Sequence, residues 1–116
     1  MKVLVCGSRR GFPRNKIKAR LMQLPKDVTI VEGECDGVDL MARAVALELG
    51  LDVVGIPANW VRYGKSAGPI RNRRMLDMLG DGDLVIAFHG DLANSKGTKD
   101  TVQEAKTRSI HVEIIS

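Results

Sequence analysis

The sequence predicts an α/β fold in which a five-stranded parallel sheet lies between two layers of helices. Short apolar segments rich in Val and Ile alternate along the chain with longer segments whose apolar residues recur every three or four positions. The first pattern is typical of buried strands and the second of amphipathic helices. Strands that alternate with helices form parallel sheets with right-handed crossovers. The length fits a single domain over residues 1–116.

Turn-forming residues delimit the predicted elements. Gly7, Gly33 and Pro57 close the first three strands, Pro25 ends the first helix, and Gly50 suits the C-terminal cap of the second. The prediction therefore has strands at 2–6, 28–32, 52–56, 83–88 and 110–115, and helices at 14–24, 36–49, 69–79 and 98–108. The long connection between the third strand and the third helix is expected to be a functional loop.

Composition narrows the class of protein. The chain carries 18 basic and 14 acidic residues, a net charge of +4 that permits nucleic-acid binding without requiring it. Its four aromatic residues are few for a protein that stacks single-stranded bases. No apolar run approaches the roughly 18–20 residues that span a bilayer, and no signal-peptide pattern is present. We expect a cytoplasmic protein with two free thiols, no zinc-type ligand spacing and no cofactor.

The loops that follow the strands are expected to meet at one edge of the sheet. They begin at Gly7, Gly33, Pro57 and His89, each at the carboxyl end of a predicted strand. In open parallel sheets this edge is where ligands bind, near the point at which the strand order reverses. The same loops contain most of the chain's Gly, Ser, Arg and Asp residues outside the helices.

The segment GKSAGPIRNRRM, residues 64–75, predicts an anion site. A helix N-terminus offers free N–H groups and a partial positive charge, which attract phosphate. Successive helical residues are about 100° apart, so Arg71 and one neighbour are expected to face the cleft while Arg74 faces solvent. A charged helix surface is the alternative. Lys65 and Ser66 lack the spacing of a P-loop, which excludes a Walker NTPase.

Two further loops predict ligand contacts. Gly7, Ser8 and Arg9 occupy the place of a first phosphate loop, without the GxGxxG pattern of dinucleotide sites. Ser95, Gly97 and Thr98 begin the last helix. They are expected to form a second anion site, opposite the one at the helix start in residues 64–75.

Asp36 is predicted to be the N-cap of the second helix. The roles of two other residues stay open at this point. Asp39 either orients a ribose or holds neighbouring backbone. Trp60 either forms a wall for a base or packs its loop onto the sheet.

These motifs resemble those of a known family. GSR at 7–9, G-x-x-x-G-x-D at 33–39, ANW at 58–60, the segment at 64–75 and S-x-GT at 95–98 resemble, in order, the SLOG superfamily and its small bacterial and phage proteins related to YspA and YpsA. Relatives include the LOG phosphoribohydrolases and the DNA-processing protein DprA. The resemblance implies a Rossmann-like three-layer domain that binds nucleotides, nucleotide-derived signals or nucleic acid, and frequently a homo-oligomer.

The chain departs from the LOG pattern at the catalytic glutamate. Thr101 stands where that motif has glutamate, and Glu104 lies one helical turn further on. Phosphate capture is therefore favoured over glycosidic cleavage, with Glu104 and His89 as the weak catalytic candidates. The prediction is a nucleotide-binding cleft; the alternatives are a LOG-like phosphoribohydrolase and DprA-like DNA binding. The expected ligand contacts are Gly7, Ser8, Arg9, Gly33, Asp39, Trp60, Lys65, Gly68, Arg71, Asn72, Ser95, Gly97 and Thr98.

Overall fold

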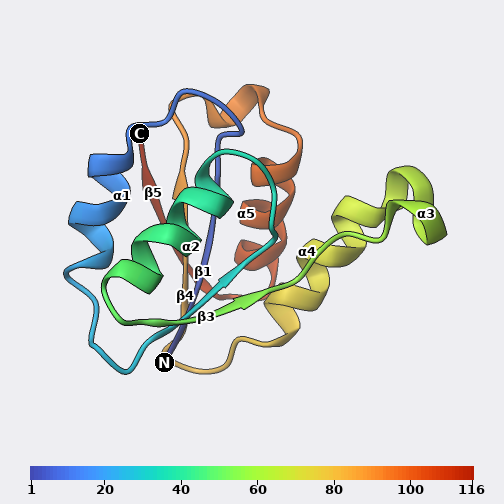
Figure 1. Ribbon diagram of the computed structural model, residues 1–116. Helices are drawn as coiled ribbons and strands as arrows, with labels where there is room; N and C mark the ends of the chain where they lie inside the picture. The colour runs from blue at the N-terminus through green and yellow to red at the C-terminus, as the bar shows by residue number, and fades with distance from the viewer.

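A computed structural model describes all residues from Met1 to Ser116 and confirms the predicted α/β architecture (Figure 1). One sheet of five strands has the order β3-β2-β1-β4-β5, and every neighbouring pair is parallel. This is the Rossmann-like arrangement, in which the chain builds outward from β1 in one direction and then returns to its other side. The strands are β1 (Lys2–Gly7), β2 (Thr29–Glu32), β3 (Asp52–Gly55), β4 (Leu84–Phe88) and β5 (His111–Ile115).

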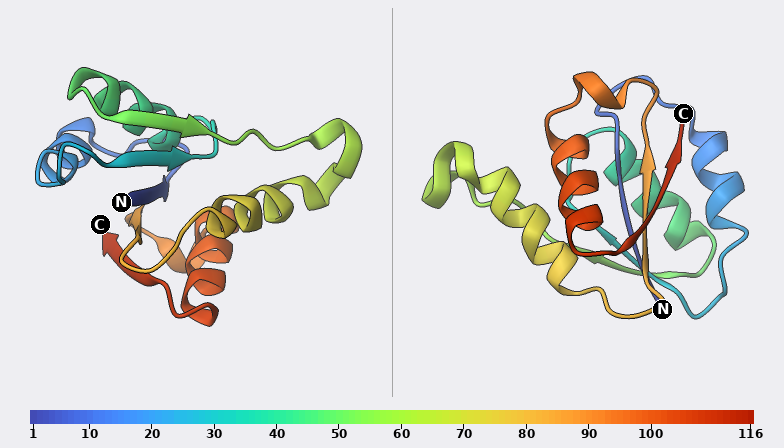
Figure 2. Two further views of the ribbon diagram at one scale, coloured as in Figure 1. Left: turned by 90° about the horizontal axis from the view of Figure 1, so that it is seen from below. Right: turned by 180° about the vertical axis from the view of Figure 1, so that it is seen from behind.

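Helices cover both faces of the sheet (Figure 2). One layer consists of α1 (Arg14–Leu21) and α2 (Val38–Glu48), and the other of α4 (Ala67–Asp77) and α5 (Gly97–Thr107). Every strand and helix predicted from the sequence is present, with ends that move by a few residues. None of the helices is long and apolar enough to cross a membrane.

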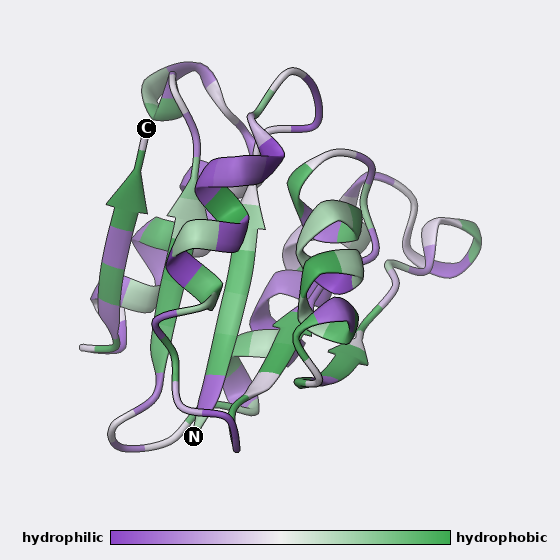
Figure 3. Ribbon diagram, turned by 60° about the vertical axis from the view of Figure 1, so that its left-hand side comes forward, coloured by the Kyte–Doolittle hydropathy of each residue, from purple (hydrophilic) through white to green (hydrophobic).

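The two faces of the sheet form two separate apolar cores. Along β1, Val3 and Val5 pack toward α1 and α2, whereas Leu4 packs toward α4 and α5. This alternation follows from the two-residue period of a strand. The strands are apolar along most of their length, while the helices carry both apolar and hydrophilic residues (Figure 3). The α4/α5 core is the smaller of the two. Two of its residues, Cys6 and Met75, also line the cleft described below.

The segment predicted as a loop at 57–68 has structure of its own. It contains a short helix, α3 (Trp60–Tyr63), and a 3-10 turn, η1 (Gly64–Ser66), before α4 begins. The Asn59 side chain accepts a hydrogen bond from the Arg62 N–H and so caps α3. Four residues are too few to show helical periodicity in the sequence. Residues 57–66, here called the arm, project beyond the body of the protein (Figures 1 and 2).

The start of α2 differs from the sequence prediction. Gly37, not Asp36, occupies the N-cap position, and no side chain caps this helix. Gly37 has a φ of +83°, and a Cβ there would lie 2.3 Å from the carbonyl oxygen of Ser8. The prediction of an Asp36 cap is thus wrong, because the loop after β1 packs directly on the start of α2 and only glycine fits between them.

Candidate functional site

A cleft of about 370 Å³ opens at the carboxyl end of the sheet. Its floor includes Cys6 and Gly7 at the end of β1. The β1–β4 ladder continues to Gly7, but the β1–β2 ladder ends at Leu4, so the edge is less closely paired on the β2 side. This is the point at which the strand order reverses, where open α/β sheets bind ligands. The volume lies within the range of small-molecule sites.

Eight of the predicted contact residues line this cleft. They are Gly7, Arg9, Asp39, Arg71, Asn72, Ser95, Gly97 and Thr98. They come from the loop after β1, from α2, from the middle of α4 and from the start of α5. The fold therefore brings together residues that are far apart in the sequence.

Asp39 holds the loop that follows β2. Its Oδ2 accepts hydrogen bonds from the backbone N–H groups of Gly33, at 3.1 Å, and Cys35, at 3.3 Å. Burial raises the pKa of Asp39, and the Cys35 amide and the nearby positive charge of Arg71 partly oppose that rise. Of the two roles left open by the sequence, the structure shows this carboxylate holding neighbouring backbone.

Arg71 is buried and ties α4 to the same loop. Its Nη1 donates to the Gly33 carbonyl at 2.7 Å and to Cys35 Sγ at 3.4 Å, and its Nε donates to Asn72 Oδ1 at 2.9 Å. These bonds fix the plane of the guanidinium, while Nη2 has no hydrogen-bond partner in the protein. Because Arg71 also lines the cleft, Nη2 is the donor that a bound anion can use.

The start of α5 forms the opposite wall. Ser95 Oγ accepts the Thr98 N–H at 3.2 Å, and Thr98 Oγ1 donates to the Gly7 carbonyl at 3.1 Å. Asn72 Nδ2 donates to Asp100 Oδ2 at 3.1 Å, which joins α4 to α5. The Gly97 N–H belongs to the first turn of α5, where backbone amides lack helical partners. The wall thus presents the positive end of a helix dipole to the cleft.

Positive charge predominates in the cleft. Arg9, Arg71 and Lys96 line it, and Asp39 is the only carboxylate that does so. Neither Arg9 nor Lys96 forms an ion pair with an acidic side chain. His89 also lines the cleft, and its Nδ1 accepts the Asp91 N–H at 2.9 Å. A neutral His89 ring therefore carries its proton on Nε2.

Five predicted contact residues lie outside the cleft: Ser8, Gly33, Trp60, Lys65 and Gly68. Ser8 uses its backbone between β4 and α2, donating to Phe88 and accepting from Val38. Gly33 is buried between the side chains of Asp39 and Arg71. Trp60 and Lys65 belong to the arm, and the Trp60 ring packs near Gly68.

The sequence predicted that the start of α4 would face the Ser95–Thr98 turn across the cleft. In the structure, no residue of the first turn of α4 lines the cleft. The helix enters the cleft one turn further on, with Arg71 and Asn72. Trp60 does not line the cleft and is half exposed; it begins α3, which projects away from the body of the protein (Figure 1).

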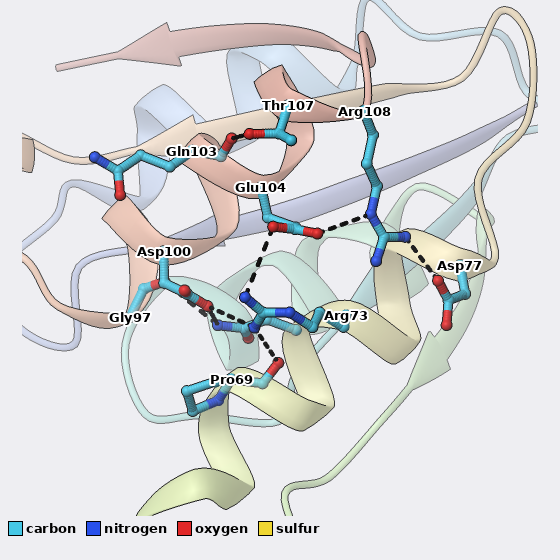
Figure 4. Close-up of polar contacts among 10 residues, drawn as sticks. Pro69, Arg73, Asp77, Gly97, Asp100, Gln103, Glu104, Thr107 and Arg108 are labelled. Carbon is cyan, nitrogen blue, oxygen red and sulfur yellow. Dashed lines mark hydrogen bonds and ion pairs between the residues drawn. The ribbon is translucent and has the colours of Figure 1, made fainter.

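Arg73 and Glu104 belong to a separate polar network between α4 and α5 (Figure 4). Arg73 lies 3.7 Å from carboxylate oxygens of both Asp100 and Glu104. Glu104 also accepts a hydrogen bond from Arg108 Nε at 3.2 Å. Glu104, one of the two weak catalytic candidates, thus has two cationic partners and does not line the cleft. Arg74 is exposed, as predicted.

Sequence reasoning did not select several cleft residues. Lys96 stood within the S-x-GT motif, and its charge was an available signal. Cys6 and Cys35, the two expected free thiols, both line the cleft, and burial raises the pKa of Cys6. Met75 closes the GKSAGPIRNRRM segment and Thr101 stands at the glutamate position of the LOG motif, but neither was predicted as a ligand contact. No group of three or more His, Cys, Asp or Glu side chains is arranged to hold a metal ion.

Comparison with known protein families identifies the first half of the chain. Residues 1–63 match the model of the YspA and cpYpsA-related SLOG family. The chain belongs to this SLOG family. The matched region runs from β1 to α3 and includes Gly7, Arg9 and Asp39, whereas the contributions of α4 and α5 to the cleft lie beyond it.

Among solved structures, this SLOG protein is similar to DNA processing protein A (DprA) from Streptococcus pneumoniae. The TM-score is 0.56 at 17% sequence identity, over 96% of this chain and 57% of the DprA chain. The chain thus spans a little over half of that protein. At this identity the likeness concerns the fold. Comparison with curated protein sequences gave no significant match.

Proposed function

We propose that the cleft binds a nucleotide or a nucleotide-derived phosphorylated ligand. The observation that carries the proposal is the donor set at the switch point: Arg9, Arg71 and Lys96 line one cleft together with Gly97 at the start of α5. Guanidinium groups and helix N-termini both favour phosphate oxygens. Membership of a SLOG family supports the same ligand class.

The cleft is better suited to holding a ligand than to cleaving it. Its one carboxylate, Asp39, already accepts two backbone hydrogen bonds. Thr101 lines the cleft near the start of α5, and its hydroxyl donates to the Gly97 carbonyl at 3.3 Å. Glycosidases commonly use a pair of carboxylates that flank the bond to be cleaved. The cleft has Asp39 alone, with His89 as the one other acid–base candidate among those named from the sequence.

Calorimetric titration tests the proposal. Nucleoside mono- and diphosphates, ADP-ribose and cyclic nucleotides serve as probes, with the unphosphorylated nucleosides for comparison. We expect Arg9→Ala to weaken binding of the best phosphorylated probe by roughly tenfold, the value of one charge-assisted hydrogen bond. Arg10→Ala is the matched control, because Arg10 is the adjacent exposed arginine and does not line the cleft.

Two results would contradict the proposal. One is the absence of binding tighter than millimolar for every phosphorylated probe. The other is an equal effect of Arg9→Ala and Arg10→Ala, which would indicate general surface charge and not a defined site.

A further inference from the structure

The arm is a second surface that the cleft does not use. Its short helix α3 exposes 52% of Trp60, all of Val61 and 38% of Tyr63. The Asn59 cap and the contact of the Trp60 ring with the region of Gly68 give this projecting segment a defined shape. The other exposed apolar side chains, such as Met22, Leu40 and Leu47, are aliphatic, so the arm carries the exposed aromatic rings of the protein.

The four aromatic residues fall into two pairs, one in the core and one on the arm. Phe12 and Phe88 pack edge to face in the core, with ring centroids 5.6 Å apart. The other two aromatic residues, Trp60 and Tyr63, both lie on α3. The small number of aromatic residues disfavours base stacking. The structure, however, places both aromatic rings that are not in the core on one exposed helix.

Positive charge accompanies these rings. The Arg62 guanidinium lies 5.2 Å from the centroid of the Tyr63 ring, and Lys65 follows on η1. Neither cation pairs with a carboxylate, and the sequence contains no Asp or Glu between Asp52 and Asp77. The arm therefore offers flat apolar faces beside unpaired cations, which complements a polyanion that itself presents flat apolar faces.

The size of the arm distinguishes between possible partners. A four-residue helix is about 6 Å long, whereas a stable protein interface buries about 800 Å² on each partner. Bases stack on individual aromatic rings, so one or two nucleotides suffice for such a surface. In a duplex the base faces are already stacked on one another. We propose that the arm binds single-stranded nucleic acid, with unpaired bases on Trp60 and Tyr63 and phosphates near Arg62 and Lys65.

Trp60 provides a direct measurement, because it is the only tryptophan in the chain. Titration of the full chain with a single strand of about 15 nucleotides, a length that covers the usual site sizes, should quench its fluorescence. DNA and RNA strands are both tested, and a DNA duplex of the same length should leave the emission unchanged. With two phosphate contacts, a plot of log association constant against log salt should have a slope between about −1 and −2.

Variants separate the arm from the rest of the surface. Trp60→Ala and Tyr63→Ala should each weaken binding of a fluorescein-labelled strand by about tenfold, the effect typical of losing one stacking ring. Leu47→Ala is the matched control, because Leu47 is an exposed apolar side chain on α2, at 63%. The proposal is independent of the cleft, so Arg9→Ala should keep the tryptophan quenching even though it weakens nucleotide binding.

Three outcomes would overturn the proposal. The first is unchanged Trp60 emission at low salt with every single strand. The second is strand binding that survives the double change Trp60→Ala and Tyr63→Ala, or that Arg9→Ala removes. The third is a shift of Trp60 emission with protein concentration alone, accompanied by dimer formation in sedimentation, which would assign the arm to a second copy of the chain.

Discussion

Replacing Glu32 by Gln should stabilise the protein above neutral pH and have little effect in acid. Glu32 ends β2 with its side chain fully buried. Its Oε1 accepts the Glu34 N–H at 3.1 Å, whereas its Oε2 has no hydrogen-bond partner and lies 3.6 Å from Arg43 Nη2. Burial raises the pKa of Glu32 from 4.5 to about 7, and the charge of Arg43 offsets only part of that effect.

The size of the effect follows from this pKa. An acid whose pKa is higher in the folded state stabilises the fold fully below its unfolded pKa and loses that contribution as the pH rises through the folded pKa. Between pH 4.5 and about 7, ionisation of Glu32 therefore costs up to about 3 kcal/mol, at 1.36 kcal/mol for each pH unit. Gln cannot ionise, but its amide N–H also needs a partner, so we expect a net gain of roughly 1–3 kcal/mol at pH 8.5.

Urea unfolding at pH 5, 6, 7 and 8.5 measures this difference. The free energies of unfolding of Glu32→Gln and the natural chain should agree at pH 5 and diverge as the pH rises. Glu34→Gln is the matched control, because Glu34 lies 3.1 Å from the same arginine but keeps 31% of its side chain exposed. A difference that does not change with pH, or a Glu32→Gln variant that is less stable at pH 8.5, would refute the reasoning.

Two further substitutions test how the cleft is held together. Gly33→Ala should cost about 1–3 kcal/mol of unfolding free energy by urea titration, because a Cβ there would lie 2.7 Å from Arg71 Nη1; Gly80→Ala has open space and should cost far less. Thr98→Val should cost about 1 kcal/mol, since it removes a hydroxyl bonded across the structure to β1, whereas Thr107→Val removes only an exposed bond within its own helix. Equal losses within either pair would contradict the assigned contacts.

Much of the site was accessible from the sequence because parallel strands end at a common edge. The motifs beginning at Gly7 and Ser95 follow β1 and β4, so their meeting at the switch point needed only the strand order. The residues misplaced by the sequence are those whose position depends on contacts between elements that are distant in the sequence. Ser8 is an example: its backbone bonds to β4 and α2 keep it out of the cleft.

The arginine-rich helix α4 likewise combines a feature that the sequence predicts with contacts that only the structure shows. Its sequence predicts an anion site at the helix start, because small residues and a proline precede several arginines. The structure keeps the helix but extends it toward the arm, so Arg71 in its second turn reaches the cleft. Arg73 instead pairs with α5, a contact that depends on how the two helices pack.

By itself, the sequence determined the α/β class, the order of the elements and the edge of the sheet at which the cleft lies. Those features follow from hydrophobic period and turn residues, which act over a few positions. The tertiary structure decided which side chains share the cleft, that Glu32 is buried with an unpartnered oxygen, and that Trp60 and Tyr63 stand together on an exposed arm. These features depend on contacts between distant segments, which local patterns do not encode.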